Sequence, residues 1–213
     1  MTDSTINAAA SPRQAAQDHR HYLRPHYQPG IPAAIEVPDA PLSELLETAA
    51  RFYPDRVAID FLGATMTYQE LLEASERAAQ VLRTSGVHKG DRVALIMPNC
   101  PQHAVALYGA LRVGAVVAEH NPLAPAEEIC SQLDAHGAQV VIVWEKGVRL
   151  VTDPSPASRT DGDALQGRTV FSVDLSAAMP VRLRAALRLP VEQARRQRAA
   201  FRARSLPAGV RSW

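Results

Sequence analysis

Lysine and cysteine are scarce in this sequence of 213 residues. Only Lys89 and Lys146 occur beside 21 arginines, so a catalytic lysine is nearly excluded. The cysteines, Cys100 and Cys130, lie on predicted helices and have no spacing typical of a disulfide framework or a zinc site. We therefore expect a protein of a reducing compartment, with a cytoplasmic location.

A clean apolar run that could span a bilayer is also missing. The N-terminal region has no apolar core of a secretory signal. Residues 93–111 are uncharged, but the middle of this stretch is interrupted by Pro98, Asn99, Pro101, Gln102 and His103. Polar groups at these positions would have no partners in hydrocarbon, so we reject a transmembrane segment here.

The composition that remains is typical of a globular domain or part of one, with 46% hydrophobic and 21% charged residues. The net charge of +1 hides an uneven distribution. Residues 1–150 carry 12 Lys/Arg against 17 Asp/Glu, whereas residues 151–213 carry 11 against 5. Basic segments of this kind often contact membranes or polyanions.

Apolar periodicity predicts a helix, a hairpin and a second helix over residues 42–86. The first helix has one apolar stripe and ends before Pro54; the stripe comprises Leu42, Leu45, Leu46, Ala49 and Tyr53. Residues 57–68 predict a hairpin of two short strands around Gly63. Thr67 can then cap a helix with Glu70 as its capping-box partner, and Gly86 can end it.

Further along, apolar strands alternate with helices. Strands are predicted at residues 92–97, 114–118 and 138–144, with helices at about 101–113 and 125–136. These strands lack polar alternation, which is typical of strands buried on both faces of a parallel sheet. We therefore predict an α/β fold, a βαβαβ parallel sheet layered with helices and preceded by a helix and a β-hairpin. Asn99 is the expected N-cap of the 101–113 helix, with Gln102 in the capping-box position.

Two stretches have some likeness to phosphate-binding loops, but neither meets the physical requirement. Residues 98–102, Pro-Asn-Cys-Pro-Gln, have no glycine to let backbone N–H groups approach a phosphate. Residues 84–90, Thr-Ser-Gly-Val-His-Lys-Gly, follow a helix, so the negative end of its dipole faces them. We interpret the first stretch as a capped turn and the second as a helix end with a turn.

Other polar clusters predict no site either. His19, His21 and His26 lack a fixed fourth ligand for a metal, so a solvated stretch is expected. Residues 119–121, Glu-His-Asn, end a strand at the pole where α/β sheets bind ligands, but a turn is the default interpretation. No nucleophile–histidine–acid arrangement can be assembled. The sequence therefore predicts no catalytic, cofactor-binding or metal-binding residue.

The tail, residues 180–213, contains nine arginines and one acidic residue, Glu192. Two short basic helices separated by Pro190 are predicted here. One hypothesis is a peripheral membrane contact through Leu183, Leu187 and Phe201 together with Arg182, Arg184, Arg188, Arg195 and Arg196. A solvated helix or a linker is the interpretation that we favour. Nucleic-acid binding is not expected, because aromatic residues are nearly absent.

A family resemblance rests on three stretches: YPDRVAI at 53–59, MTYQELLEASERAAQVL at 66–82, and KGDRVALIMPNCPQHAVALYGALRVGAVVAEHNPLAPAEEI at 89–129. In order and spacing they resemble the start of the adenylate-forming (AMP-binding) ligases, most closely the long-chain fatty acid–CoA ligases. The resemblance implies part of an N-terminal domain of α/β layers. For the full-length family it implies ATP, Mg²⁺, a fatty acid and coenzyme A, which react through an acyl-adenylate to a thioester.

Several parts of the family pattern have no counterpart in this sequence. These are the phosphate loop that ends in Pro-Lys-Gly, the ribose-binding aspartate and the C-terminal catalytic lysine, all downstream of the matched region in the family. We therefore expect the first third of such an enzyme, inactive alone and without its own cofactor site. The alternative is a non-catalytic binding or membrane-associated module that retains part of the ligase fold.

The expected organisation is a flexible arm at residues 1–40, a ligase-like α/β region at 41–150, and a linker with a basic helical tail at 151–213. A parallel sheet without its later strands would leave an edge and apolar helix faces uncovered. We therefore expect poor solubility of the isolated chain.

Overall fold

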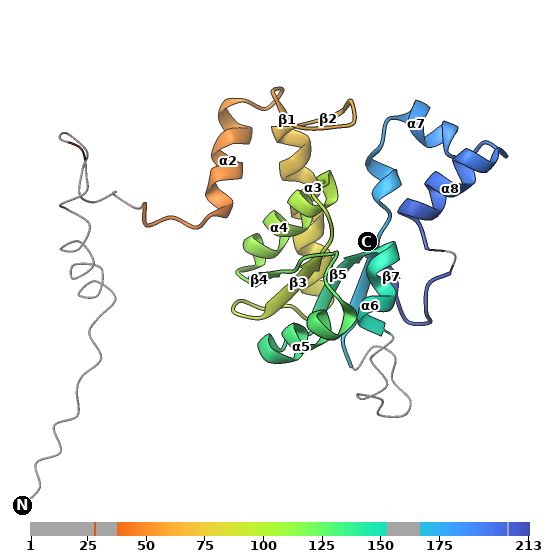
Figure 1. Ribbon diagram of the computed structural model, residues 1–213. Coiled ribbons are helices and arrows are strands. Elements are labelled where there is room, and N and C mark those ends of the chain that lie inside the picture. The colour runs from red at the N-terminus through yellow and green to blue at the C-terminus, as the bar shows by residue number, and fades with distance from the viewer. Residues whose placement is uncertain (1–27, 29–37, 153–166, 204) are drawn as a thin grey trace, which may run out of the picture. The chain divides into compact units, whose positions relative to one another are not determined.

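The computed structural model describes residues 28, 38–152, 167–203 and 205–213 (Figure 1). Contacts divide the chain into two units, Met1–Ala40 and Pro41–Trp213, and the second contains every helix and strand described below. The predicted N-terminal arm falls almost wholly outside the described residues, as do His19, His21 and His26.

Helix α2 (Ser43–Phe52) confirms the first predicted helix, but its apolar stripe is buried only in part. Leu46 and Ala50 are buried, whereas three residues of the predicted stripe remain more than half exposed: Leu42, Leu45 and Tyr53. The buried positions are four residues apart and face α3. The apolar residues of α2 therefore divide between a packed side and a side that no described residue covers, a division that periodicity alone does not reveal.

The predicted hairpin is confirmed. Strand β1 (Val57–Phe61) pairs antiparallel with β2 (Ala64–Thr67). Leu62 and Gly63 connect them with φ angles of 56° and 87°, and the Asp60 carboxylate accepts a hydrogen bond from the Gly63 N–H at 2.9 Å. A left-handed pair of this kind matches the twist of the strands that it joins.

Helix α3 (Tyr68–Thr84) begins with the predicted capping box. Thr67 Oγ1 accepts a hydrogen bond from the Glu70 N–H at 3.2 Å, and Glu70 Oε2 accepts one from the Thr67 N–H at 2.8 Å. These two bonds satisfy donors that the first turn of a helix otherwise leaves unpaired. Gly86, at a φ of 87°, lies just beyond the other end, as its position in the sequence predicts.

A five-stranded parallel sheet in the order β4-β3-β5-β6-β7 forms the centre of the unit. Its strands and their connecting helices are β3 (Arg92–Ile96), α4 (Pro101–Val113), β4 (Val116–Glu119), α5 (Ala126–His136), β5 (Val140–Trp144), η2 (Glu145–Gly147), α6 (Val148–Thr152), β6 (Thr169–Val173), η4 (Leu175–Ala178), α7 (Val181–Ala186), α8 (Glu192–Phe201) and β7 (Arg211–Ser212). The predicted βαβαβ unit is confirmed in β3 to β5. Strands β6 and β7 extend it and were not predicted.

Side chains on alternate strand positions enter two separate cores, one on each face of the sheet. On one face, Val93, Leu95 and Ile142 pack with Leu82 of α3 and Ala106 of α4. On the other face, the buried residues come from the strands, from α5 and from α6: Ala94, Ile96, Val141, Val143, Ile129, Leu133 and Val148. The sheet is thus covered by helices on both sides, which explains why its strands show no polar alternation.

The start of α4 differs from the prediction. Its N-cap is Cys100, not Asn99, and no side chain caps it. Cys100 is extended, with φ −154° and ψ 165°, and Pro101 occupies the first helical position, where no N–H needs a partner. Gln102 does not complete a capping box either, because its side-chain amide donates to the Asp174 carbonyl at 3.1 Å.

Candidate functional site

The carboxyl edge of the parallel sheet is the candidate ligand-binding site in this topology. Strands β3 and β5 are neighbours, but the chain runs from β3 to β4 on one side of the sheet and from β5 to β6 on the other, so the connections that follow these two strands leave in opposite directions. Open parallel sheets bind ligands outside the carboxyl ends of the strands at such a reversal. Three residues follow the strands here directly: Met97 after β3, Glu145 after β5 and Asp174 after β6.

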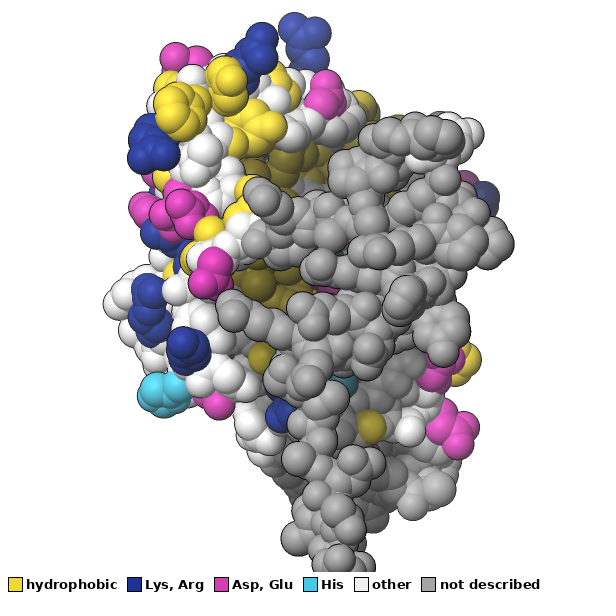
Figure 2. All heavy atoms as spheres, turned by 90° about the vertical axis from the view of Figure 1, so that its left-hand side faces the viewer, with side chains coloured by type: hydrophobic (Ala, Val, Ile, Leu, Met, Phe, Trp, Pro, Cys, Tyr) yellow, Lys and Arg dark blue, Asp and Glu magenta, His cyan; other side chains and the backbone are white. Residues whose placement is uncertain are grey.

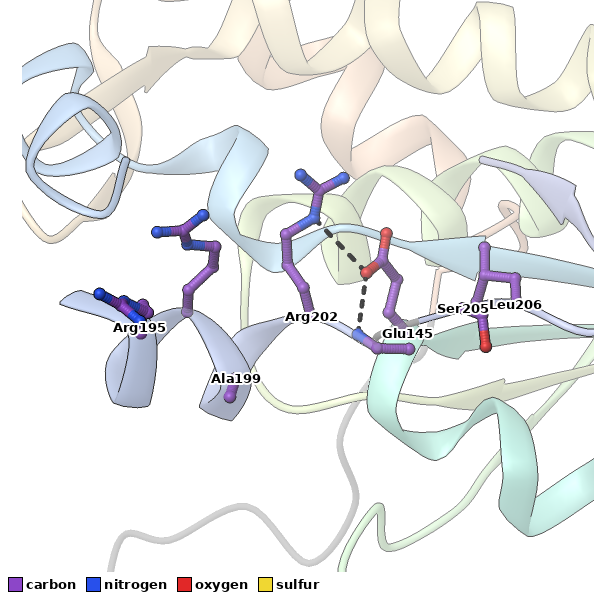
Figure 3. Close-up of a pocket in the computed structure, with 8 residues that line it drawn as sticks. Glu145, Arg195, Ala199, Arg202, Ser205 and Leu206 are labelled. Carbon is purple, nitrogen blue, oxygen red and sulfur yellow. Dashed lines mark hydrogen bonds and ion pairs between the residues drawn. The ribbon is translucent and has the colours of Figure 1, made fainter. Parts of the chain in front are cut away.

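Arg202, at the end of α8, joins two of these strand ends. Its Nε lies 3.5 Å from Glu145 Oε2, and its Nη2 lies 3.2 Å from Asp174 Oδ2. Glu145 Oε2 also accepts a hydrogen bond from the Ala203 N–H at 3.1 Å, and Figure 3 shows both interactions of this carboxylate. Since the Glu145 side chain is only 10% exposed, Arg202 supplies the charge that its burial requires.

Asp174 is engaged on its other side as well. Its Oδ1 accepts a hydrogen bond from the Ser176 N–H at 2.9 Å and so caps the turn η4. Both strand-end carboxylates are therefore used to hold backbone and Arg202. Within the described residues, no group of three or more His, Cys, Asp or Glu side chains could hold a metal ion.

A hollow of about 640 Å³ opens beside this ion pair. Figure 3 shows Arg195 and Ala199 of α8 on one side and Glu145, Arg202, Ser205 and Leu206 on the other. Arg198 lines the hollow too. The tail that follows Pro190 thus contributes most of the lining, and its side chains are mainly basic and apolar.

The described residues at this edge do not fit a nucleoside triphosphate with Mg²⁺. The first turn of α4 points its N–H groups here, but Pro101 has none, and the His103 N–H donates to the Cys100 carbonyl at 3.0 Å. No glycine lies between Ile96 and Pro101 to let a phosphate approach the backbone.

The second loop-like stretch, residues 84–90, lies at the C-terminal end of α3, as predicted. Thr84 Oγ1 donates to the Val81 carbonyl at 2.9 Å, and Ser85 Oγ donates to the same carbonyl at 2.8 Å. Both hydroxyls are therefore used to satisfy the last turn of the helix. The positions that a phosphate would need as donors face carbonyl oxygens instead.

The strand-end residues Glu119 and His120, interpreted as a turn, take part in two histidine contacts that the sequence did not predict. Glu119 Oε2 lies 2.9 Å from His103 Nε2 of α4. The buried His120 lies 2.8 Å from Gln132 Oε1 through Nδ1 and 2.9 Å from His136 Nε2 through its own Nε2. Asn121 forms the expected turn, since its Oδ1 accepts from the Leu123 N–H at 3.0 Å.

The hydrogen bonds fix the protonation of this histidine pair. His136 Nδ1 accepts from the Ala138 N–H at 3.2 Å, so the ring proton of neutral His136 is on Nε2. Nε2–H then donates to His120 Nε2, and His120 donates from Nδ1 to Gln132. Burial lowers the pKa of His136 below its ordinary value, and His120, Arg92 and Arg168 add to this effect. The hydrogen bonds of this pair therefore favour two neutral imidazole rings.

The cysteines are not activated nucleophiles. Burial raises the pKa of the Cys100 thiol, although the backbone N–H groups of His103 and Gln102 oppose this shift. Burial and the nearby Asp134 raise the pKa of Cys130. Both side chains are thus neutral thiols near neutral pH, and thiolate chemistry is not favoured at either position.

The tail forms the two predicted helices, α7 and α8, with Pro190 between them. Two of the three apolar residues assigned to a membrane contact face protein, since Leu187 is buried and Phe201 packs against the sheet core. Leu183 remains 45% exposed. None of the helices that the structure describes is both long and apolar enough to cross a bilayer.

Comparison with known proteins identifies the family of this chain. The family model described as AMP-binding enzyme matches residues 46–199. The chain belongs to this family. A long-chain-fatty-acid–CoA ligase of Bacillus subtilis (strain 168) is 34% identical over 130 residues, which are 59% of this chain and 23% of that protein. The chain spans about a fifth of the length of such curated relatives.

Solved structures of similar proteins support this assignment to the family. A benzoate CoA ligase from Burkholderia xenovorans LB400 superposes with a TM-score of 0.53 at 30% identity, covering 61% of this chain and 25% of that one. The inhibitor-bound N-terminal domain of FACL13 from Mycobacterium tuberculosis gives a TM-score of 0.52 at 26% identity, covering 78% and 37%. The α/β architecture, with its parallel five-stranded sheet, is therefore that of the N-terminal domain of adenylate-forming ligases.

Proposed function

We propose that this chain is the N-terminal part of a long-chain fatty acid–CoA ligase and does not activate a fatty acid by itself. The observation that carries the proposal is the match of residues 46–199 to AMP-binding enzymes, in a chain that covers only 23% of a curated fatty acid–CoA ligase. In this proposal, ATP, Mg²⁺, coenzyme A and the fatty acid are ligands of the full-length enzyme.

The physical argument for inactivity is electrostatic. Acyl adenylation places negative charge on transferring phosphate oxygens, and enzymes stabilise it with backbone N–H donors, a cation and a metal ion. In this chain, Glu145 and Asp174 are bound to Arg202, and Lys146 is the only lysine near the carboxyl edge. The described residues at this edge form the scaffold of a nucleotide-binding domain but lack the set of groups that binds a triphosphate.

The test is ATP–pyrophosphate exchange with the purified chain and a long-chain fatty acid. We expect exchange at the level of the blank, because the described residues at the carboxyl edge do not combine backbone N–H donors, a lysine and a metal site for a triphosphate. A matched positive control is a full-length bacterial long-chain fatty acid–CoA ligase under the same conditions. Saturable exchange by the 213-residue chain would contradict the proposal.

The DNA that follows the codon for Trp213 gives a second, independent test. A continuation in any frame that encodes a Ser/Thr/Gly-rich loop ending in Pro-Lys-Gly supports the ligase proposal. An unrelated intergenic sequence instead supports the non-catalytic module as the biological product.

Membrane association is a second candidate for that module. The exposed surface of α7 favours it, since Val181 is 70% and Leu183 is 45% exposed beside Arg182. Co-sedimentation with liposomes tests this candidate. We expect binding to anionic but not to neutral liposomes, and a loss of binding in Val181→Ser/Leu183→Ser. Equal sedimentation with both liposome types would exclude the electrostatic contact.

A further inference from the structure

Two arginines of α8 and its C-cap residue form an arginine stripe, which we define as Arg195, Arg198 and Arg202. Arg195 and Arg198 are three residues apart and so lie on the same side of the helix. All three line the hollow of about 640 Å³. Figure 3 shows the Arg202 side chain directed at Glu145, while Arg195 lies nearer the start of α8.

The members of the stripe differ in how their charge is balanced. Arg202 is paired with Glu145 and Asp174. Arg195 donates only to the Pro190 carbonyl at 3.0 Å, and Arg198 only to the Leu189 carbonyl at 3.5 Å, with no carboxylate partner for either in the described part of the chain. The Nε of Arg198 is buried and has no acceptor at all among the described residues.

Arg198 also lines a second, smaller hollow of about 60 Å³. Arg184 and Arg188 line it together with Asp174, and Arg184 donates to the Ala177 carbonyl at 3.3 Å. Further arginines therefore line each of the two hollows that Arg198 borders. The acidic residues that line the two hollows, Glu145 and Asp174, are both occupied by Arg202, so an excess of positive charge remains.

We propose that the larger hollow binds a phosphate group, with Arg195 and Arg198 as its donors. A phosphate presents several charged oxygens in different directions, which suits two separate planar guanidinium forks better than a single carboxylate does. Ala199 and Leu206, which also line the hollow, supply an apolar wall for the group that carries the phosphate. The ligand class is a phosphate ester with an apolar substituent, either a soluble molecule or a lipid headgroup. This inference does not depend on the proposed function, since it concerns binding to α8 rather than catalysis.

The experiment uses the full chain and two probes. Phenyl phosphate, measured by calorimetric titration, represents the soluble source. Phosphatidylcholine vesicles with and without phosphatidic acid, measured by co-sedimentation, represent the lipid source. We expect saturable binding of at least one phosphate ester, and the probe that binds identifies the source. In Arg195→Gln/Arg198→Gln, affinity should fall about tenfold or more, because both charge-assisted forks are lost.

The matched control is Arg51→Gln/Arg77→Gln, which removes the same charge from exposed residues of α2 and α3 that line neither hollow. Its affinity should stay within about twofold of the parent, since contributions of distant surface charges are screened. Arg195→Lys/Arg198→Lys keeps the charge without the forks and should show an intermediate loss. Thermal melts check that each variant folds. Absence of binding for both probes, or an equal loss in the two glutamine variants, would overturn the proposal.

Discussion

Gly109 of α4 lies directly against Ala78 of α3. A Cβ atom added at Gly109 would stand 2.6 Å from the Ala78 Cβ and 3.2 Å from the Ala79 backbone nitrogen. This close approach brings the two helices together over the first core of the sheet. The φ angle of Gly109 is not in the left-handed region, so the close helix packing, and not the backbone conformation, favours glycine at this position.

Gly109→Ala should therefore destabilise the chain despite the better helix propensity of alanine. The clash with Ala78 requires α3 and α4 to move apart, and overpacking of this kind costs about 1–3 kcal/mol. Urea unfolding monitored by circular dichroism measures the change. The double variant Gly109→Ala/Ala78→Gly should recover part of the loss, because it removes the nearest atom. An increase in stability of the single variant would contradict this packing.

Thr67→Ala should destabilise the chain by about 1 kcal/mol, since the hydroxyl that caps α3 is lost. Thr67→Ser is the matched control, because serine keeps an oxygen at hydrogen-bond distance from the Glu70 N–H. The free energy of unfolding in urea separates the two variants. If serine and alanine reduce it equally, the methyl group and not the cap is responsible.

Signals that depend on neighbours in sequence were sufficient to predict much of this fold. The capping box at Thr67 and Glu70, the turn at Gly63 and the glycine after α3 act over three or four residues. The parallel pairing of β3, β4 and β5 followed from strands that are apolar on both faces. These features need no knowledge of distant parts of the chain.

Features that depend on distant partners could not be predicted in the same way. Strand β7 has two residues, Arg211–Ser212, and exists because β6 offers it an edge. The Arg202–Glu145 pair joins residues that are far apart in the sequence. Asn99 is a good N-cap by residue type, but the chain places Cys100 there, and the side chain of Gln102 binds the carbonyl of Asp174.

The uncovered apolar surface leads to a prediction about solubility. Figure 2, which views the side of the molecule that lies to the left in Figure 1, shows hydrophobic side chains exposed between charged ones. On α2 the exposed apolar residues include Leu45 and Phe52, which are 62% and 63% exposed. Leu45→Lys/Phe52→Lys should raise the soluble fraction after centrifugation without lowering the melting temperature, because both side chains are more than half exposed. A loss of stability instead would show that this surface is covered within the chain.

The His120–His136 pair predicts a pH dependence of stability. The pKa of His136 is lower in the folded chain than the ordinary histidine pKa of about 6.5. Between these two pKa values, the unfolded chain therefore binds more protons than the folded chain does. The stabilisation is therefore present above about pH 6.5 and decreases as the pH falls towards the folded-state pKa. Protonation would also place a donor on Nδ1 against the Ala138 N–H.

Urea unfolding at about pH 7.5 and pH 5.5 measures this effect. His136→Gln should be less stable than the parent at the higher pH and should lose less on acidification. His88→Gln is the control for replacing a histidine elsewhere in the chain, because His88 is exposed and its ring lies 3.6 Å from Asp91 and not against His136. An unchanged loss in His136→Gln would show that the pair does not cause the dependence.

Replacement of Arg202 tests whether its ion pairs hold α8 at the carboxyl edge of the sheet. Arg202→Met removes the guanidinium that lies between Glu145 and Asp174. Among the described residues, it leaves the nearly buried Glu145 with only the Ala203 N–H as a partner. An acceptor left without its partner in such a place costs about 1–3 kcal/mol, and α8 should detach from the sheet first. Hydrogen exchange of the α8 amides, together with urea unfolding, detects both effects. The control is Arg196→Met, whose partner Glu192 is exposed, so the free energy of unfolding should change by less than about 0.5 kcal/mol. Similar exchange rates in the two variants would mean that α8 is held by its apolar contacts and not by Arg202.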